Sequence, residues 1–130
     1  MNSSKKLPNF IRKDERGLFV EALNGIVWKN ISYGIMKKGS VMGNHYHKKT
    51  SVYFFIIKGS VRIDSVDIHA KEVQAITLQE NEGVIFFPNH SHAITFTQDS
   101  IFIMGKSEKY DQNNPDTFEY KITRKDYGDS

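Results

Sequence analysis

Short apolar stretches recur along the chain at intervals of roughly 8–12 residues, with turn-forming residues between them, as in an all-β sandwich or barrel. In Val61–Val66, apolar residues alternate with Arg62 and Asp64, as on a strand with one buried face. Val52–Ile57 is apolar almost throughout, which is typical of a central strand. No segment has the periodicity of a long amphipathic helix. The pattern predicts strands over Leu18–Leu23, Ile31–Met36, Val52–Ile57, Val61–Val66, Val73–Leu78, Val84–Phe87, His92–Thr97, Ile101–Met104 and Thr117–Ile122.

The predicted strands follow one another without a linker, a repeat or a low-complexity tract. A chain of 130 residues suits one domain with one hydrophobic core. We therefore expect residues 1–130 to form a single all-β domain, with residues 1–9 and 123–130 as frayed tails.

Composition narrows the classes of function. The chain has no cysteine, which excludes a disulfide framework and a thiolate zinc site. Its polar N-terminus and the lack of a long apolar run predict a cytoplasmic protein without a membrane partner. The net charge of +3 is explained by a mildly basic surface, and the alternative is a pocket that attracts an anionic small molecule such as a nucleotide diphosphate. Nucleic acid is not an expected partner, because the basic residues are scattered and form no recognition motif.

The histidines are the residues with the clearest chemical pattern. Four of the five fall in two short segments, one containing His45 and His47 and the other containing His90 and His92. Residues two apart on a strand point to the same face, so His45 and His47 are expected to enter one cavity. The apolar stretch after them would form a dry wall, and His92 follows the sharp Pro88-Asn89 turn.

These two segments resemble the two sequence motifs of the cupin family. Gly39, His45, His47 and Gly59 fall in register with the first motif, and Val52 stands where that motif has a glutamate. In the second motif, His92 takes the place of the histidine. The resemblance implies a cupin double-stranded β-helix, which is a jelly-roll barrel.

The flanking residues resemble RmlC-like enzymes of nucleotide-sugar metabolism. Residues 14–19 resemble the Asp-x-Arg-Gly-x-Phe signature of dTDP-4-dehydrorhamnose 3,5-epimerases. Residues 45–49 resemble the His-Ala-His-Lys-Lys segment of dTDP-4-keto-6-deoxyhexose 3,4-ketoisomerases. Residues 43–47 and 110–118 are similar to the cupin domain of bifunctional capsule-sugar epimerase-reductases. The resemblance implies an isomerase or epimerase of a nucleotide-linked 4-keto-6-deoxy sugar in bacterial surface polysaccharide biosynthesis.

The same resemblance implies roles for individual residues. His45 corresponds to the catalytic base of the epimerases, with His47 and Tyr110 as further catalytic candidates. Met104, however, stands where the epimerases have an acid tyrosine. Arg16 corresponds to an arginine that pairs with the nucleotide diphosphate, which suits the two parallel bonds of a guanidinium. The remaining substrate-binding candidates are Phe19, Lys49, Tyr53 and Arg62.

Two questions stay open at the level of the sequence. One is metal: His45, His47 and His92 are a donor set for a divalent ion such as zinc, nickel or iron, although the motif glutamate is replaced by Val52. No organic cofactor is expected. The other is the class of function, because a non-catalytic sugar-binding or regulatory cupin and a metal-dependent small-molecule cupin enzyme are the alternatives. Since open barrel edges invite association, we also expect a homodimer.

Overall fold

Strands make up nearly all the regular structure of the chain. The computed structural model describes residues 4–25 and 27–128, and no α-helix occurs among them. The strands are β1 Lys5–Lys6, β2 Phe10–Asp14, β3 Gly17–Glu21, β4 Asn30–Met36, β5 Val41–Tyr46, β6 Val52–Lys58, β7 Val61–Asp67, β8 Val73–Leu78, β9 Glu82–Phe86, β10 His90–Phe96, β11 Ser100–Lys106 and β12 Phe118–Glu119, followed by a 3₁₀ helix, η1, at Arg124–Tyr127.

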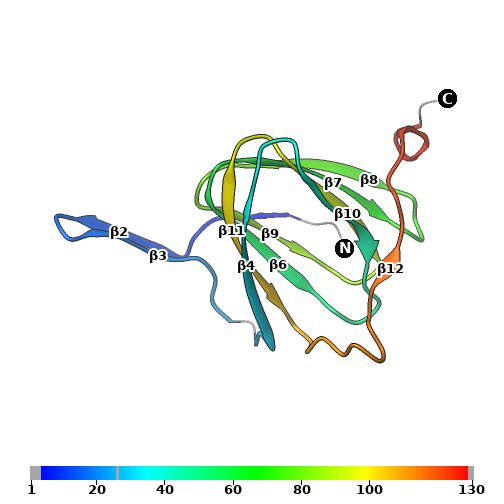
Figure 1. Cartoon of the computed structure of the whole chain (residues 1–130), viewed down its shortest axis with the longest axis horizontal. Coiled ribbons are helices and arrows are strands. Elements are labelled where there is room, and N and C mark those ends of the chain that lie inside the picture. Colours follow the sequence, from blue (N-terminus) through cyan, green and yellow to red (C-terminus); the bar gives the residue numbers. More distant parts are fainter. Residues whose placement is uncertain (1–3, 26, 129–130) are drawn as a thin grey trace.

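Two antiparallel five-stranded sheets enclose the core (Figure 1). The first sheet has the order β1-β9-β6-β11-β4, and the second has the order β12-β5-β10-β7-β8. Strands β2 and β3 form a separate hairpin, which extends away from the barrel in Figure 1. This arrangement confirms the predicted all-β jelly-roll barrel.

The core lies between the two sheets. Phe54 and Phe86 of the first sheet meet Phe96 of the second, and all three side chains are fully buried. A smaller cluster of Tyr53, Phe55 and Ile85 lies on the outer face of the first sheet, under the segment that follows the hairpin. Since β6 is covered on both faces, its unbroken apolar run has a structural explanation.

The two ends of the chain are more ordered than the sequence predicted. Lys5 and Lys6, expected to form no regular element, form β1 because they pair with Val84 and Gly83 at the edge of the first sheet. Near the C-terminus, η1 is closed by a capping box between Thr123 and Asp126. The Tyr127 hydroxyl donates a hydrogen bond to Asp64. Residues 1–3, 26 and 129–130 lie outside the described residues, so the prediction of frayed tails is untested for 1–3 and 129–130.

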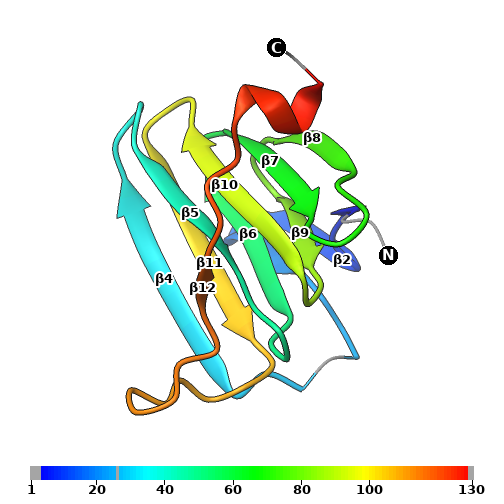
Figure 2. The same ribbon diagram turned by 90° about the vertical axis from the view of Figure 1, so that its right-hand side faces the viewer.

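The predicted last strand over 117–122 is shorter than expected. Only Phe118 and Glu119 pair, and they do so with Tyr46 and His45 of β5. Figure 2 shows the C-terminal segment crossing beside β5 and continuing to η1. The segment is thereby placed next to the strand that carries the first histidine of the cluster.

Candidate functional site

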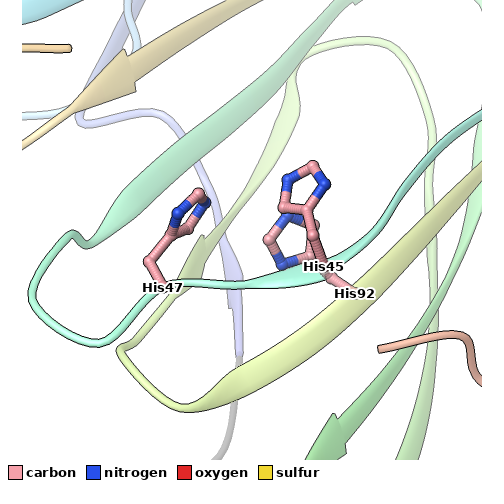
Figure 3. A group of neighbouring side chains, drawn as sticks. All are labelled: His45, His47 and His92. Carbon is pink, nitrogen blue, oxygen red and sulfur yellow. The ribbon is translucent and has the colours of Figure 1, made fainter. Parts of the chain in front are cut away.

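The three predicted histidines come together inside one end of the barrel (Figure 3). His45 lies on β5, His47 directly follows that strand, and His92 lies on the neighbouring β10. Ring centroids are 5.2 Å apart for His45 and His47, 4.9 Å for His45 and His92, and 5.9 Å for His47 and His92. One ring nitrogen of each residue lies within 4.8 Å of the others. The His45 and His47 rings thus lie close together, and His47 lines a pocket whereas His45 lies behind it in the cluster.

An irregularity in the pairing of β5 with β10 sets this arrangement. His45 lies opposite His92, whereas Gly43 lies opposite Ala93, so Asn44 is an extra residue in β5. Asn44 has φ of 59° and Gly43 has φ of 103°, conformations typical of a bulge. A Cβ atom at Gly43 would lie 2.3 Å from the carbonyl oxygen of His92. Glycine is therefore required here, both for its backbone conformation and for the close approach of β10.

His92 is the innermost ring of the cluster. It stacks on Phe86, with ring centroids 4.1 Å apart and an angle of 6° between the planes. Burial, with further contributions from the charges of His45 and His47, lowers the pKa of His92 to about 3. The ring is therefore neutral at physiological pH, and its nitrogens are available as a hydrogen-bond donor and an acceptor.

The carbonyl of Asp116 fixes the protonation of His47. His47 Nδ1 lies 2.5 Å from this oxygen, and because a carbonyl only accepts hydrogen bonds, Nδ1 carries the proton. A neutral His47 then keeps a lone pair on Nε2. Burial is the largest cause that lowers the pKa of both His45 and His47. The cluster thus presents neutral imidazoles, which can accept a proton near neutral pH.

The carboxylate of Asp116 holds the turn that follows β5. It accepts hydrogen bonds from the backbone amides of Lys48, Lys49 and Thr50 and from the Thr50 hydroxyl, at 2.8 to 2.9 Å. Burial alone would raise the pKa of Asp116, but these bonds together lower it below 3.8. Asp116 therefore connects the loop at 111–118 to His47 through its main-chain carbonyl and to the turn through its side-chain carboxylate.

A pocket of about 390 Å³ opens beside His47. Its wall contains Tyr110 and four lysines, and the lysines outnumber the acidic residues by one; the charged residues are Lys48, Lys49, Lys106, Lys109, Glu108, Asp111 and Asp116. Such a pocket suits a ligand with a negatively charged part and a neutral part. Two predicted residues, Lys49 and Tyr110, are therefore in place beside His47, and Tyr110 remains 64% exposed.

Four other predicted substrate-binding residues do not line this pocket. Arg16 and Phe19 lie on the projecting β2–β3 hairpin, where the Arg16 guanidinium pairs with Asp14 at 2.7 Å. Tyr53 lies on the outer side of the first sheet because its ring packs with Trp28 and its hydroxyl donates to the carbonyl of Ala22. Arg62 pairs with Asp64, next to η1. Within one chain, none of these four side chains reaches the histidine cluster.

Two residues of the site escaped the sequence interpretation. Lys106 follows Phe102 and Met104 at strand spacing, and this period of two places it on the inward face of β11. That signal was present but was read no further than Met104. Asp116 was not among the predicted site residues, because its contacts with residues 47–50 span a sequence separation that local patterns do not report.

The cluster fits a metal ion in geometry but not in charge. Three imidazole nitrogens lie close enough to share an ion. However, no carboxylate joins them at position 52, where Val52 is 1% exposed within the apolar core. Lys106 instead adds a positive charge that acts on all three rings. Neutral imidazoles are themselves good zinc ligands, but the missing carboxylate and the nearby ammonium group both weaken the match to a divalent ion, and the predicted metal stays untested.

Comparisons with known proteins agree with this architecture. The sequence model of the polysaccharide biosynthesis C-terminal domain family matches residues 12–118. The chain is 30% identical over 112 residues to UDP-2-acetamido-2,6-beta-L-arabino-hexul-4-ose reductase of Pseudomonas aeruginosa. The match covers 83% of this chain but only 30% of the length of that relative.

Solved structures give the same result for the fold. A 3,4-ketoisomerase from Helicobacter canadensis superposes with a TM-score of 0.76 at 22% identity, covering 91% of this chain and 90% of the other. The capsular polysaccharide assembling protein CapF from Staphylococcus aureus superposes with a TM-score of 0.69 at 26% identity, covering 87% of this chain and 32% of the other. Among the residues described, none of the helical structure is long and apolar enough to cross a membrane.

Proposed function

Because the chain belongs to the polysaccharide biosynthesis C-terminal domain family, we propose that it is an isomerase or epimerase of a nucleotide-linked 4-keto-6-deoxy sugar. The observation that carries the proposal is the histidine cluster, of which His47 lines a pocket that also contains four lysines. The curated relative is named for a UDP-linked sugar whose carbonyl is at C4, which belongs to the same chemical class. The solved structures that superpose on the chain include a sugar 3,4-ketoisomerase in complex with TDP.

The reaction requires removal of a proton next to the ketone. Carbon atoms beside a carbonyl are acidic because the carbanion is delocalised onto the carbonyl oxygen. A base within hydrogen-bond reach of that proton must be unprotonated at the working pH, which for histidine means the neutral ring. His45 is our candidate, since it is the least buried of the three rings and burial keeps it unprotonated. His47 and Tyr110, which lie beside the same pocket, are candidates to return a proton on the other side.

The charged part of the substrate is assigned to the lysines. Lys49 and Lys109 line the pocket, and an ammonium group binds phosphate as a point charge. Arg16 can serve as the diphosphate clamp only if the hairpin of one chain reaches the site of another, since it lies away from its own histidines. We therefore propose a homodimer in which the hairpin is exchanged between sites.

The outer face of β4 supports association. Ile31, Tyr33 and Ile35 are 69%, 77% and 73% exposed, and β4 is the edge strand of the first sheet. A row of exposed apolar side chains beside an unpaired edge is typical of an interaction surface.

A non-catalytic sugar-binding cupin is the second candidate. The observation in its favour is Met104, because a thioether cannot donate a proton where the epimerases have a tyrosine. Incubation of the wild-type protein with dTDP- and UDP-linked 4-keto sugars in D₂O distinguishes the two. The enzyme should introduce deuterium at C3 or C5, detected by mass spectrometry, whereas a binding protein should raise the melting temperature without exchange.

A further inference from the structure

Lys106 is placed where it can act on the histidine cluster. It is the last residue of β11 and pairs in register with Val52 of β6. Directly paired residues of antiparallel strands point to the same face, and Val52 points into the core. The Lys106 side chain is therefore on the inner side of the first sheet, one strand step beyond Met104, which packs against the same core. It emerges at the pocket that contains His47.

The ammonium group of Lys106 lacks a counterion in the described part of the chain. No ion pair or side-chain hydrogen bond of Lys106 occurs among the residues of known placement, and the residue is half-buried. Of the acids that line the same pocket, Glu108 pairs with Lys29 at 3.3 Å, and the Asp116 carboxylate is bound to the turn after β5. Asp111 also lines the pocket, and no ion pair joins it to Lys106 among the described residues. An unpaired cation that is partly removed from water is electrostatically suited to receive an anion.

The residue paired with Lys106, Val52, indicates which kind of site the lysine replaces. The first cupin motif has a glutamate at position 52, where a carboxylate would add negative charge to the histidines. Here the carboxylate is absent, and a lysine is paired with the same position. The strand register thus places a positive side chain, which lines the same pocket as His47, opposite the position where the motif has a negative one.

We propose that Lys106 converts the histidine cluster from a divalent metal site into an oxyanion site, in which its ammonium group stabilises the enolate oxygen of the substrate. This role rests on the proposed function. When the base removes the proton next to the ketone, the electron pair moves onto the carbonyl oxygen, and Lys106 is the cation beside it. A fixed charge next to a developing oxyanion is the kind of contact that lowers such a barrier most.

The first test measures metal binding and needs no turnover. Zinc affinity of tag-free protein is determined by competition with a chromophoric chelator for the wild type, Lys106→Met, and the double variant Val52→Glu with Lys106→Met. We expect about 10–100-fold tighter zinc binding in Lys106→Met and a further gain in the double variant. Lys58→Met, which removes an exposed lysine at the far end of β6, should leave the affinity unchanged. Wild-type zinc binding as tight as that of both variants would overturn the proposal.

The second test measures catalysis. In the solvent-exchange assay, Lys106→Met should lower kcat by about 10²–10³-fold with little change in KM, the effect of losing one oxyanion contact. Lys106→Arg, which keeps the charge, should recover part of the rate. Equal rates for wild type and Lys106→Met would refute the catalytic role. If the wild type introduces deuterium into no substrate tested, the proposed function fails. The zinc comparison then still shows whether Lys106 weakens metal binding by the histidines.

Discussion

Replacing Asp116 by asparagine is expected to loosen the turn after β5 and the position of His47. The carboxylate accepts four hydrogen bonds, one on Oδ1 from Lys48 and three on Oδ2 from Lys49 and Thr50. An asparagine has one carbonyl oxygen, so at best it keeps the three bonds at one position. It turns an amide group towards the remaining donor and removes the negative charge.

The size of the effect follows from these contacts. A hydrogen bond to a charged group contributes about 1.5–3 kcal/mol, and because Asp116 is only partly buried we expect the lower half of that range. The free energy of unfolding, measured by urea denaturation at pH 7, should therefore fall by about 1.5–2 kcal/mol. Glu119→Gln, which removes an exposed carboxylate on the adjacent β12, should change it by less than about 0.5 kcal/mol.

The pH dependence of the free energy of unfolding tests the same role of Asp116. The pKa of Asp116 in the folded protein lies below 3.8, so its contribution is complete above that value and is lost as the pH falls through the folded pKa. The difference between wild type and Asp116→Asn should thus be constant from pH 7 to about 5 and shrink below pH 4. A variant as stable as the wild type at pH 7, or a difference that grows in acid, would refute the assignment.

Three further predictions concern the histidine cluster. Gly43→Ala should destabilise the protein by at least about 2 kcal/mol in urea denaturation, since a left-handed backbone and a contact with the His92 carbonyl both oppose a Cβ atom; a neutral effect would contradict the bulge. His92→Leu should make the free energy of unfolding less sensitive to acid. The pKa of His92 in the folded protein, about 3, lies below the ordinary 6.5, so the wild type loses stability as the pH falls from about 6.5 towards 3. An unchanged slope in pH-dependent denaturation would exclude His92 as a cause. If Arg16 acts on the site of a second chain, mixing inactive Arg16→Ala and His45→Asn proteins should restore about a quarter of the wild-type exchange sites through heterodimers, whereas no recovery after subunit exchange would place Arg16 elsewhere.

The sequence predicted those features that depend on local periodicity. Most strands from Ile31 to Met104 were predicted because apolar residues alternate or run continuously and turns separate them. The strand β5, Val41–Tyr46, was not in the predicted set, because Gly43 and Asn44 interrupt the apolar pattern. The spacing of two residues correctly predicted that the His45 and His47 side chains lie together. Motif position then added His92, which the structure brings to the same point although it is distant along the chain.

The features that were missed depend on contacts between distant segments. Lys5 and Lys6 form a strand only because β9 offers them a partner, and nothing in their own sequence favours one. The Asp116 contacts join residues more than 60 positions apart. Tyr53 was expected near the substrate, but its position in the alternating pattern of β6 turns it to the opposite face from Val52. In each case the position was decided by strand pairing and by the face of the sheet on which a side chain lies, which residue type alone does not indicate.

The central claim is that His45 removes a proton from a carbon beside the ketone of a nucleotide-linked sugar. The most direct measurement is the rate of deuterium incorporation from D₂O into a 4-keto nucleotide sugar by the wild type and by His45→Asn, with nucleotide affinity measured on the same samples. The account predicts a loss of about 10²–10⁴-fold in the exchange rate and nearly unchanged nucleotide affinity, because the lysines that bind the diphosphate remain. Exchange by His45→Asn at the wild-type rate would contradict it.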